Sequence, residues 1–175
     1  MPPEFKRKNI RLPAEHYRGQ RSYFITACFE KRRTYGTRPA VARWLIASLR
    51  KHAVANGFLI HAYCLMPDHL HFLAEGANKN SDLLKFVASF KKETGHQFEG
   101  REKQRLWQFK FFDHILRSRT NVEAVCWYIW LNPVRGGFCR APGEHAFSGS
   151  FTQQGSKLLK AAPAAGWAPP WKSEM

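Results

Sequence analysis

The sequence predicts an α+β fold, in which helices pack on one face of an antiparallel sheet. Three observations predict it. The chain has 175 residues, a length typical of one domain. Strand and helix patterns follow the order strand, helix, strand, strand, helix, strand, helix. Only Pro67 and Asp68 join the second and third strands, which favours an antiparallel hairpin. Together these observations predict the split β-α-β arrangement of the ferredoxin-like fold.

The first strand and the first helix are predicted from composition and periodicity. Residues 22–29 are rich in aromatic and β-branched side chains, which predicts a strand. Thr37 is expected to cap a helix whose first turn tolerates Pro39. Apolar residues then recur at helical spacing as far as Asn56, and Gly57 follows as part of a stop signal.

The hairpin and the second helix come next. Residues 58–66 and 69–75 are predicted to be its two strands, and the second of them is expected to lie centrally in the sheet. Ser81 is expected to cap the following helix. The apolar stripe of this helix consists of Leu83, Phe86, Val87 and Phe90.

The last elements are less regular. Residues 106–115 are rich in aromatic side chains and are predicted to contain the fourth strand. Asn121 is expected to begin a third helix. This helix should end near Asn132, because a residue that precedes proline disfavours the helical region.

Composition also suggests how the chain is divided and where the protein resides. Residues 1–20 are interpreted as a basic arm, residues 21–148 as the folded domain and residues 149–175 as a flexible or docked tail. The four cysteines show no C-x-x-C spacing, which argues against a structural zinc site and a disulfide framework. No secretory signal and no membrane-spanning run is visible, so we expect a cytoplasmic protein without membrane contact.

Basic residues greatly outnumber acidic ones. Lys and Arg number 28 and Asp and Glu number 13, which gives a formal net charge of +15 at pH 7. Such an excess, mixed with aromatic side chains, is typical of nucleic-acid-binding proteins, although a merely soluble basic surface is the plainer alternative. The residues expected to contact a DNA backbone are Lys6, Arg7, Lys8, Arg11, Lys85, Lys91, Lys92 and Arg135.

His69 and His71 form the most informative motif. Two residues apart on a strand, they point to the same face, and two adjacent imidazoles can hold a divalent metal. Leu70, Phe72 and Ala74 point the other way and suit the core, so the histidines are expected on the more open face. A pair of ordinary hydrogen-bonded histidines would give the same pattern.

Tyr128 and Asn132 lie four residues apart on the predicted third helix and therefore share one of its faces. Of the five tyrosines, only Tyr128 lies on a predicted helix with an amide one helical turn away. Asn132 could supply an oxygen ligand to a metal held by the histidines. Mg²⁺ and Mn²⁺ suit phosphate chemistry, and Mn²⁺ matches imidazole better. Packing of this aromatic helix into a core is the alternative explanation.

These motifs resemble those of the single-tyrosine HUH transposases, and within them the REP-associated tyrosine transposases. Residues 63–71 match the block in which an apolar residue separates two histidines. Residues 128–135 and the glycines that follow resemble the Tyr-x-x-x-Asn-Pro-x-Arg-x-Gly block, and residues 107–117 are similar to an intervening block. The similarity covers about residues 8–150, and Asn132 favours the REP-associated branch over mobile relatives that often carry Gln.

The resemblance implies a transposase domain that cleaves single-stranded DNA with Tyr128 as nucleophile. Attack on a phosphorus atom would leave a 5′-phosphotyrosine and a free 3′-OH. The metal, Mg²⁺ or Mn²⁺, would lie on His69, His71 and Asn132 and polarise the scissile phosphate. The implied substrate is a palindromic repeat that folds into a hairpin. Either His114 or an ordered water would accept the tyrosine proton.

Two other functions are consistent with the same sequence. A non-catalytic nucleic-acid-binding module on a ferredoxin-like sheet would need neither a metal nor Tyr128. A metal-dependent nuclease that uses water would cleave DNA without forming a protein adduct. A homodimer, in which Tyr128 serves the metal site of the partner, is also left open.

Overall fold

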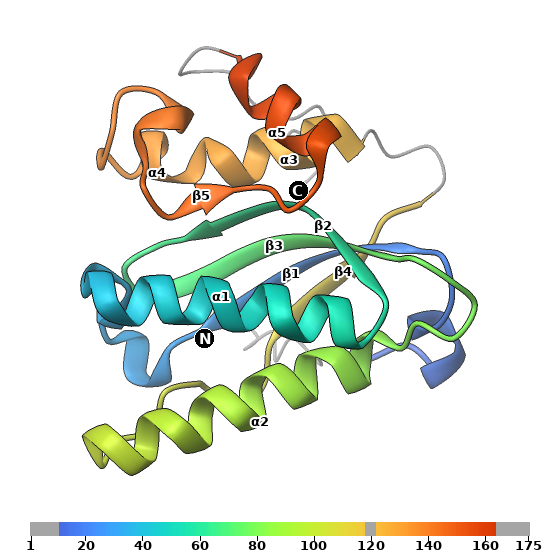
Figure 1. Ribbon diagram of the computed structural model, residues 1–175, viewed down its shortest axis with the longest axis horizontal. Helices are drawn as coiled ribbons and strands as arrows, with labels where there is room; N and C mark the ends of the chain where they lie inside the picture. The colour runs from blue at the N-terminus through green and yellow to red at the C-terminus, as the bar shows by residue number, and fades with distance from the viewer. Residues whose placement is uncertain (1–10, 118–121, 164–175) are drawn as a thin grey trace, which may run out of the picture.

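The computed structural model describes residues 11–117 and 122–163, which form a five-stranded antiparallel sheet with helices on both faces (Figure 1). The strand order is β4-β1-β3-β2-β5, and its first four members have the order of the split β-α-β arrangement. The predicted α+β fold, with the histidine strand in a central position, is therefore confirmed. The strands are β1 (Ser22–Cys28), β2 (Phe58–Leu65), β3 (His69–Gly76), β4 (Phe112–Ile115) and β5 (Ser148–Gly149).

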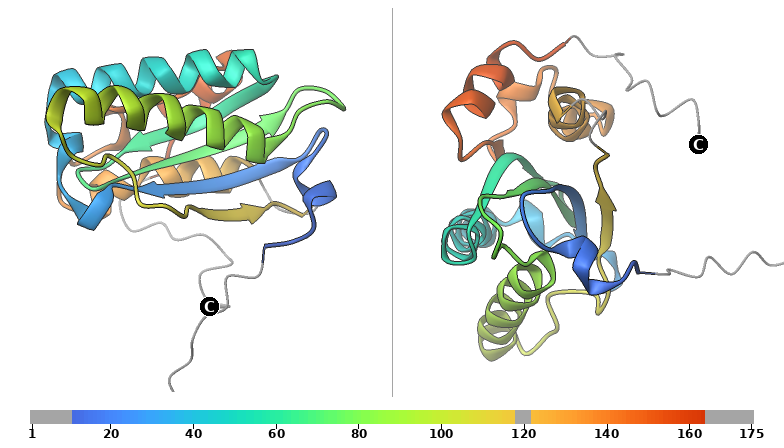
Figure 2. Two further views of the ribbon diagram at one scale, coloured as in Figure 1. Left: turned by 90° about the horizontal axis from the view of Figure 1, so that it is seen from below. Right: turned by 90° about the vertical axis from the view of Figure 1, so that its right-hand side faces the viewer.

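The two long helices, α1 (Pro39–Ala55) and α2 (Leu83–Glu102), cover one face of the sheet, as Figure 2 shows. They meet the sheet through the larger of two apolar clusters, which includes the predicted stripe of α2. Large side chains with no more than 1% exposure fill this cluster from both layers: Ile25, Leu45, Leu49, Phe72, Phe86 and Phe90. This face supplies most of the hydrophobic stabilisation of the domain.

A second, smaller helical layer covers part of the opposite face. It consists of α3 (Val122–Trp130), α4 (Asn132–Arg135) and α5 (Gln153–Lys160). The expectation of helices on one face alone is corrected here, because Ala62 and Cys64 of β2 and Leu73 of β3 are apolar on this face too. The cluster contains Ala62, Cys64, Met66, Leu73, Val125, Cys126, Ile129 and Trp130.

The helix caps differ from those predicted. Thr37 was expected to cap α1, but its hydroxyl donates to the Thr34 carbonyl inside a short 3₁₀ turn, 2.7 Å away. Ser81 was expected to cap α2, but the carboxylate of Asp82 performs that role and accepts from the Lys85 backbone N–H at 3.1 Å. Propensity alone does not distinguish neighbouring residues that can both cap a helix, so the cap position depends on the backbone.

The third predicted helix is divided into α3 and α4. Its expected first residue, Asn121, lies outside the described residues. The helix ends at Trp130, and helical structure resumes at Asn132 with Pro133 in its first turn. A proline is tolerated there because first-turn N–H groups have no helical partner. Only Leu131 separates the two helices, so Asn132 still lies about one turn after Tyr128.

Both ends of the described chain contact the domain. Tyr17, in a short 3₁₀ helix (Ala14–Tyr17), is buried, and its hydroxyl donates to Asp113 on β4 at 2.7 Å. At the other end, the Trp130 indole N–H donates to the Gly149 carbonyl at 3.0 Å, which fixes β5 to α3. No strand or helix was predicted in either segment, and the boundaries at residues 20 and 148 stay a prediction.

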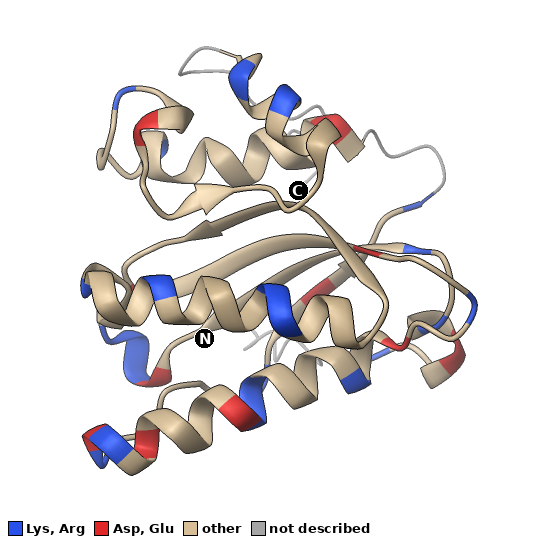
Figure 3. Cartoon of the chain, viewed as in Figure 1, with Lys and Arg blue, Asp and Glu red and all other residues tan. Residues whose placement is uncertain are grey.

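The basic residues and the cysteines are spread over several elements of the fold. Lysines and arginines are spread over the helices and the loops at both ends of the sheet (Figure 3). The four cysteines are free, and Cys64 is buried whereas Cys28 is half-buried. No helix in the described part of the chain is long and apolar enough to cross a membrane.

Candidate active site

The two histidines of β3 lie side by side on the face opposite to α1 and α2. Their Nε2 atoms are 2.9 Å apart. Between and beyond them, Leu70 and Phe72 are buried in the core under the long helices. The predicted alternation along this strand is therefore confirmed, and it brings two imidazole nitrogens together at one point of the sheet.

Each imidazole is held through its other ring nitrogen. His69 Nδ1 lies 2.6 Å from Asp68 Oδ1, and His71 Nδ1 lies 2.7 Å from Thr26 Oγ1. Thr26 is the direct partner of His71 in the β1–β3 ladder, so the strand register creates this contact. Arg32 donates to the second carboxylate oxygen of Asp68 at 3.1 Å. This arrangement is the one that orients metal-binding histidines, with a polar partner behind each ring.

Two groups of this site have shifted pKa values. Burial lowers the pKa of the His71 imidazole well below its ordinary value, and the charges of His69 and Arg135 lower it further. Partial burial raises the pKa of Asp68, but the hydrogen bond from His69 and the charge of Arg32 outweigh it and leave the pKa below its ordinary value. A neutral His71 therefore faces the site at pH 7, and neutral imidazole is the form that ligates metals.

A close backbone contact supports the hairpin that carries His69. The N–H of Gly36 donates to the Pro67 carbonyl at 2.9 Å. A Cβ atom on Gly36 would lie only 2.2 Å from the Met66 carbonyl oxygen. Only glycine therefore allows this approach, which packs the loop before α1 against the turn that ends at His69.

Tyr128 reaches the same region from α3. Its ring meets the edge of Phe24 with centroids 5.8 Å apart, and Phe24 stacks on His71 with centroids 5.3 Å apart. The guanidinium carbon of Arg135 lies 4.6 Å from the centroid of the Tyr128 ring, and Arg135 also donates to the Tyr128 carbonyl at 2.6 Å. The tyrosine and the histidine pair are thus joined by a single phenylalanine of the same chain.

Asn132 is placed one turn beyond Tyr128. Its Nδ2 donates to the carbonyls of Tyr128 at 2.9 Å and Ile129 at 3.2 Å. These bonds satisfy carbonyls at the end of α3 and fix the amide plane. Since the amide nitrogen is used in this way, only Oδ1 of Asn132 could act as a metal ligand.

The described residues contain no group of three or more His, Cys, Asp or Glu side chains that could hold a metal ion. A cation at the histidine pair would therefore need a third protein ligand of another type. A side-chain amide oxygen is such a ligand, and hard divalent cations accept it. The imidazole nitrogens of the two histidines and the amide oxygen of Asn132 are therefore donor types that fit a divalent cation such as Mg²⁺ or Mn²⁺.

His114 lies on the same face as the histidine pair. It is the β-ladder partner of Phe24 and is exposed. Directly paired residues of neighbouring strands project to the same side of a sheet, so the imidazole of His114 projects from the face that carries His71.

The predicted DNA-contact residues fall into separate groups. Lys85 and Lys92 are exposed on α2, on the far side of the sheet from the histidines. Lys91 differs, because its Nζ donates to three backbone carbonyls inside the protein. Arg11 lies 3.7 Å from a carboxylate oxygen of Asp113. The three basic residues of the N-terminus, Lys6, Arg7 and Lys8, lie outside the described residues.

Sequence reasoning missed Thr26, Phe24 and Asp68 as parts of this site. Asp68 directly precedes His69 in the chain, and this adjacency is a signal that could have found it. Thr26 and Phe24 lie more than 40 positions from the histidines. Only the register between β1 and β3 reveals them, and a single sequence does not contain that register.

Comparison of the chain with models of known protein families identifies its class. Residues 19–131 match the family described as "Transposase IS200 like". The matched part is well over half of the chain, which therefore belongs to the IS200-like transposase family.

Two curated relatives are similar to part of the chain. A Haemophilus influenzae protein assigned as a REP-associated tyrosine transposase is 26% identical over 98 residues, which are 50% of this chain and 56% of that protein. The REP-associated tyrosine transposase of Escherichia coli K12 is 25% identical over 91 residues, which are 52% of this chain and 53% of that protein. The chain spans about half the length of the curated relatives it matches, and the resemblance seen in its motifs is confirmed.

A solved structure shows the same fold. It is that of a REP-associated tyrosine transposase bound to a REP hairpin, and it superposes with a TM-score of 0.69. The two proteins are 21% identical, and the similarity covers 91% of this chain and 90% of that chain. At this identity the likeness establishes the fold and leaves the chemistry to be argued from the site.

Proposed function

We propose that this protein cleaves and rejoins single-stranded DNA at hairpin-forming repeats through a covalent bond to Tyr128. The observation that carries the proposal is the contact of one Phe24 ring with both Tyr128 and His71. A phenol and a pair of convergent imidazoles lie together in a protein of net charge +15. Binding alone would require neither the phenol nor the orientation of the two rings.

The reaction is a transesterification at phosphorus. Oη of Tyr128 attacks the scissile phosphate, the bond from phosphorus to O3′ breaks, and the departing oxygen takes up a proton to become a 3′-OH. The downstream DNA stays attached through its 5′-phosphate. Because the phosphodiester is exchanged for a phosphotyrosine ester, a later attack by a 3′-OH rejoins DNA without ATP. His114, on the same face of the sheet, or an ordered water would take the phenol proton.

His69, His71 and the Oδ1 of Asn132 would hold a divalent cation, Mg²⁺ or Mn²⁺. When bound there, the cation supplies polarisation of the scissile phosphate and stabilises its developing charge. Three observations support the fit: the Nε2 atoms converge, each Nδ1 has a polar partner, and burial keeps His71 neutral. Thr26 and Asp68 would keep the two lone pairs directed at one point.

The proposed site would be assembled from one chain. Tyr128 and His71 both contact the Phe24 ring of the same chain, so the tyrosine would serve its own histidine pair. The guanidinium of Arg135, which lies over the Tyr128 ring, would bind an oxygen of the incoming phosphate. Exposed lysines such as Lys85 and Lys92 would contact the DNA backbone further away.

A denaturing gel tests this proposal. The protein is mixed with Mn²⁺ and end-labelled hairpin DNA from repeats that flank its own gene, beside the variant Tyr128→Phe. The matched control is Tyr63→Phe, which removes the same hydroxyl from a tyrosine packed on Phe151. We expect a metal-dependent protein–DNA adduct in the wild type and in the control, and none in Tyr128→Phe.

Two results would contradict the proposal. Cleavage without an adduct, equal in the wild type and in Tyr128→Phe, would indicate a nuclease that uses water. Tight binding of several hairpins without any cleavage would indicate a nucleic-acid-binding module.

A further inference from the structure

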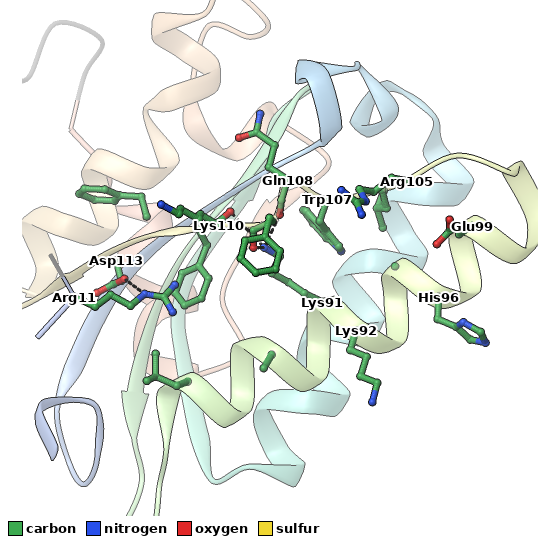
Figure 4. Close-up of a pocket in the computed structure, with 17 residues that line it drawn as sticks. Arg11, Lys91, Lys92, His96, Glu99, Arg105, Trp107, Gln108, Lys110 and Asp113 are labelled. Atoms are coloured by element: carbon green, nitrogen blue, oxygen red, sulfur yellow. Dashed lines mark hydrogen bonds and ion pairs between the residues drawn. The ribbon is translucent and has the colours of Figure 1, made fainter. Parts of the chain in front are cut away.

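A groove of about 890 Å³ lies between α2 and the segment that leads into β4 (Figure 4), and Tyr128 is not among the residues that line it. Its lining combines cationic and aromatic side chains, and none of them takes part in the proposed chemistry at phosphorus, although Lys92 was assigned above to the DNA backbone. The groove is open along one side, and its volume is in the range of about 300–1,000 Å³ found for small-ligand sites. The residues that matter below are Arg11, Lys92, Arg105, Phe109, Lys110 and Phe112.

Lys91 builds one wall of this groove. Its Nζ donates to the carbonyls of Gln108 at 2.8 Å, Phe109 at 3.0 Å and Lys110 at 3.3 Å. The ammonium group therefore ties three successive peptide units to α2. This contact, together with the hydrogen bond from the Gln108 N–H to the Cys28 carbonyl at 2.9 Å, fixes the backbone of an irregular segment.

The fixed segment presents an exposed aromatic ring. Phe109 is 90% exposed although its own carbonyl is bound by Lys91. An apolar ring held out into water gains nothing for folding, and both of its faces are accessible to a binding partner. A flat ring on a fixed backbone, beside cations, is the arrangement on which unpaired bases stack.

The charges of the groove favour a polyanion. Lys92, Arg105 and Lys110 line it in addition to Arg11 and Lys91, whereas Glu99 and Asp113 are the acidic residues of the lining. Asp113 already has partners, since it lies 3.7 Å from Arg11 and accepts from Tyr17. The remaining cations are therefore available to phosphate groups.

A chain of aromatic rings connects the groove with the tyrosine. Phe112 lines the groove and is 56% exposed. Its ring centroid lies 6.2 Å from that of Phe24, which in turn contacts Tyr128. A strand that lies in the groove and crosses the β4 edge at Phe112 thus arrives at the proposed nucleophile.

We propose that this groove binds unpaired nucleotides of the same DNA strand that Tyr128 attacks, with Phe109 as a stacking platform and Lys92 and Lys110 on the phosphates. The inference rests on the proposed function, because it assigns the groove to that substrate strand. Unpaired bases fit better than duplex, because the bases of a duplex are already stacked and offer only their backbone to such a ring.

The test measures binding without cleavage. The full chain carrying Tyr128→Phe is titrated, in metal-free buffer, with a hairpin that bears single-stranded extensions containing 2-aminopurine and with the same hairpin without extensions. Stacking of 2-aminopurine on Phe109 should change its fluorescence. When Phe109→Ala is introduced into the same chain, this change should disappear, and binding of the extended hairpin should weaken roughly fivefold to hundredfold, as expected for one lost stacking contact. Binding of the hairpin without extensions should not change. Phe109 is exposed, so this substitution leaves the core intact.

The control is Val54→Ala on α1, which shortens another side chain that is 75% exposed and lies outside the groove. It should change neither affinity. A double variant, Lys92→Gln with Lys110→Gln, should lower the salt dependence of binding for the extended hairpin only.

Two outcomes would overturn the inference. An equal loss for both hairpins would indicate that duplex lies in the groove, and no loss for either hairpin would show that Phe109 does not contact the DNA. Failure of the proposed cleavage is a separate result. In that case no adduct forms with Tyr128 intact, whereas the Phe109-dependent binding of the extended hairpin persists.

Discussion

The two faces of the sheet differ in what covers them and in what they leave uncovered. Under α1 and α2, β1 and β3 place Tyr23, Ile25, Leu70 and Phe72 in the core, and these large side chains are almost fully buried. Under α3, the apolar cluster is smaller, and Thr26, His69 and His71 occupy sheet positions beside it. One face therefore stabilises the fold, and the other carries polar groups that a fully packed core could not accommodate.

Truncation of one phenylalanine on each face gives the largest contrast. Phe86→Ala, on the helix-covered face, should lower the free energy of unfolding by about 3–5 kcal/mol, because a fully buried ring leaves a cavity. Phe24→Ala, on the open face, should cost less stability but should lower adduct formation strongly, since Tyr128 and His71 lose the ring that they share. Urea unfolding and the adduct assay measure the two effects.

Equal losses of stability in the two variants would remove this contrast. So would wild-type adduct formation in a folded Phe24→Ala protein.

Removal of the Thr26 hydroxyl tests whether this residue orients the His71 ring. Thr26→Val should weaken Mn²⁺ binding roughly 10- to 100-fold, because the Nδ1 of His71 loses the partner that orients the ring. Thr26→Ser keeps the hydroxyl and should restore most of the affinity. Isothermal titration of the metal into the DNA-free protein checks both, and a Thr26→Val protein with unchanged Mn²⁺ affinity would contradict a positioning role.

The smallest effect concerns Lys91 on α2. Burial, with a contribution from the charge of Arg11, lowers the pKa of Lys91 from 10.5 to about 8. Between these values the unfolded chain holds a proton that the folded chain has lost, so stability rises with pH in this window. The free energy of unfolding of the wild type should therefore rise relative to Lys91→Met as pH increases from about 8 to 10. A difference that stays constant with pH would show that the lysine does not titrate in this way.

Much of the fold could be predicted from the sequence because its strands and long helices have strong periodic patterns. The alternation around His69 and His71 predicted which face they occupy, and the spacing of Tyr128 and Asn132 placed both on one helical path. Both predictions depend only on residues that are near one another in the chain, and a single sequence shows such spacing directly. Their roles as nucleophile and metal ligands stay predictions.

The remaining features depend on contacts between distant segments. Thr26 meets His71, and Phe24 meets Tyr128, only because of the β1–β3 register and the packing of α3. The second helical layer was missed because apolar residues on both sides of β2 and β3 do not say what covers them. The brace that Lys91 forms was missed for a related reason, since an isolated lysine on a helix is usually solvated.

The most direct test of the central claim is peptide mapping of the covalent product. The wild-type protein is trapped with hairpin DNA and Mn²⁺, digested with nuclease and protease, and analysed by tandem mass spectrometry. We expect a peptide in which Tyr128 carries a nucleotide through a 5′-phosphate. Cleaved DNA with Tyr128 unmodified, or a nucleotide attached to another residue, would contradict it.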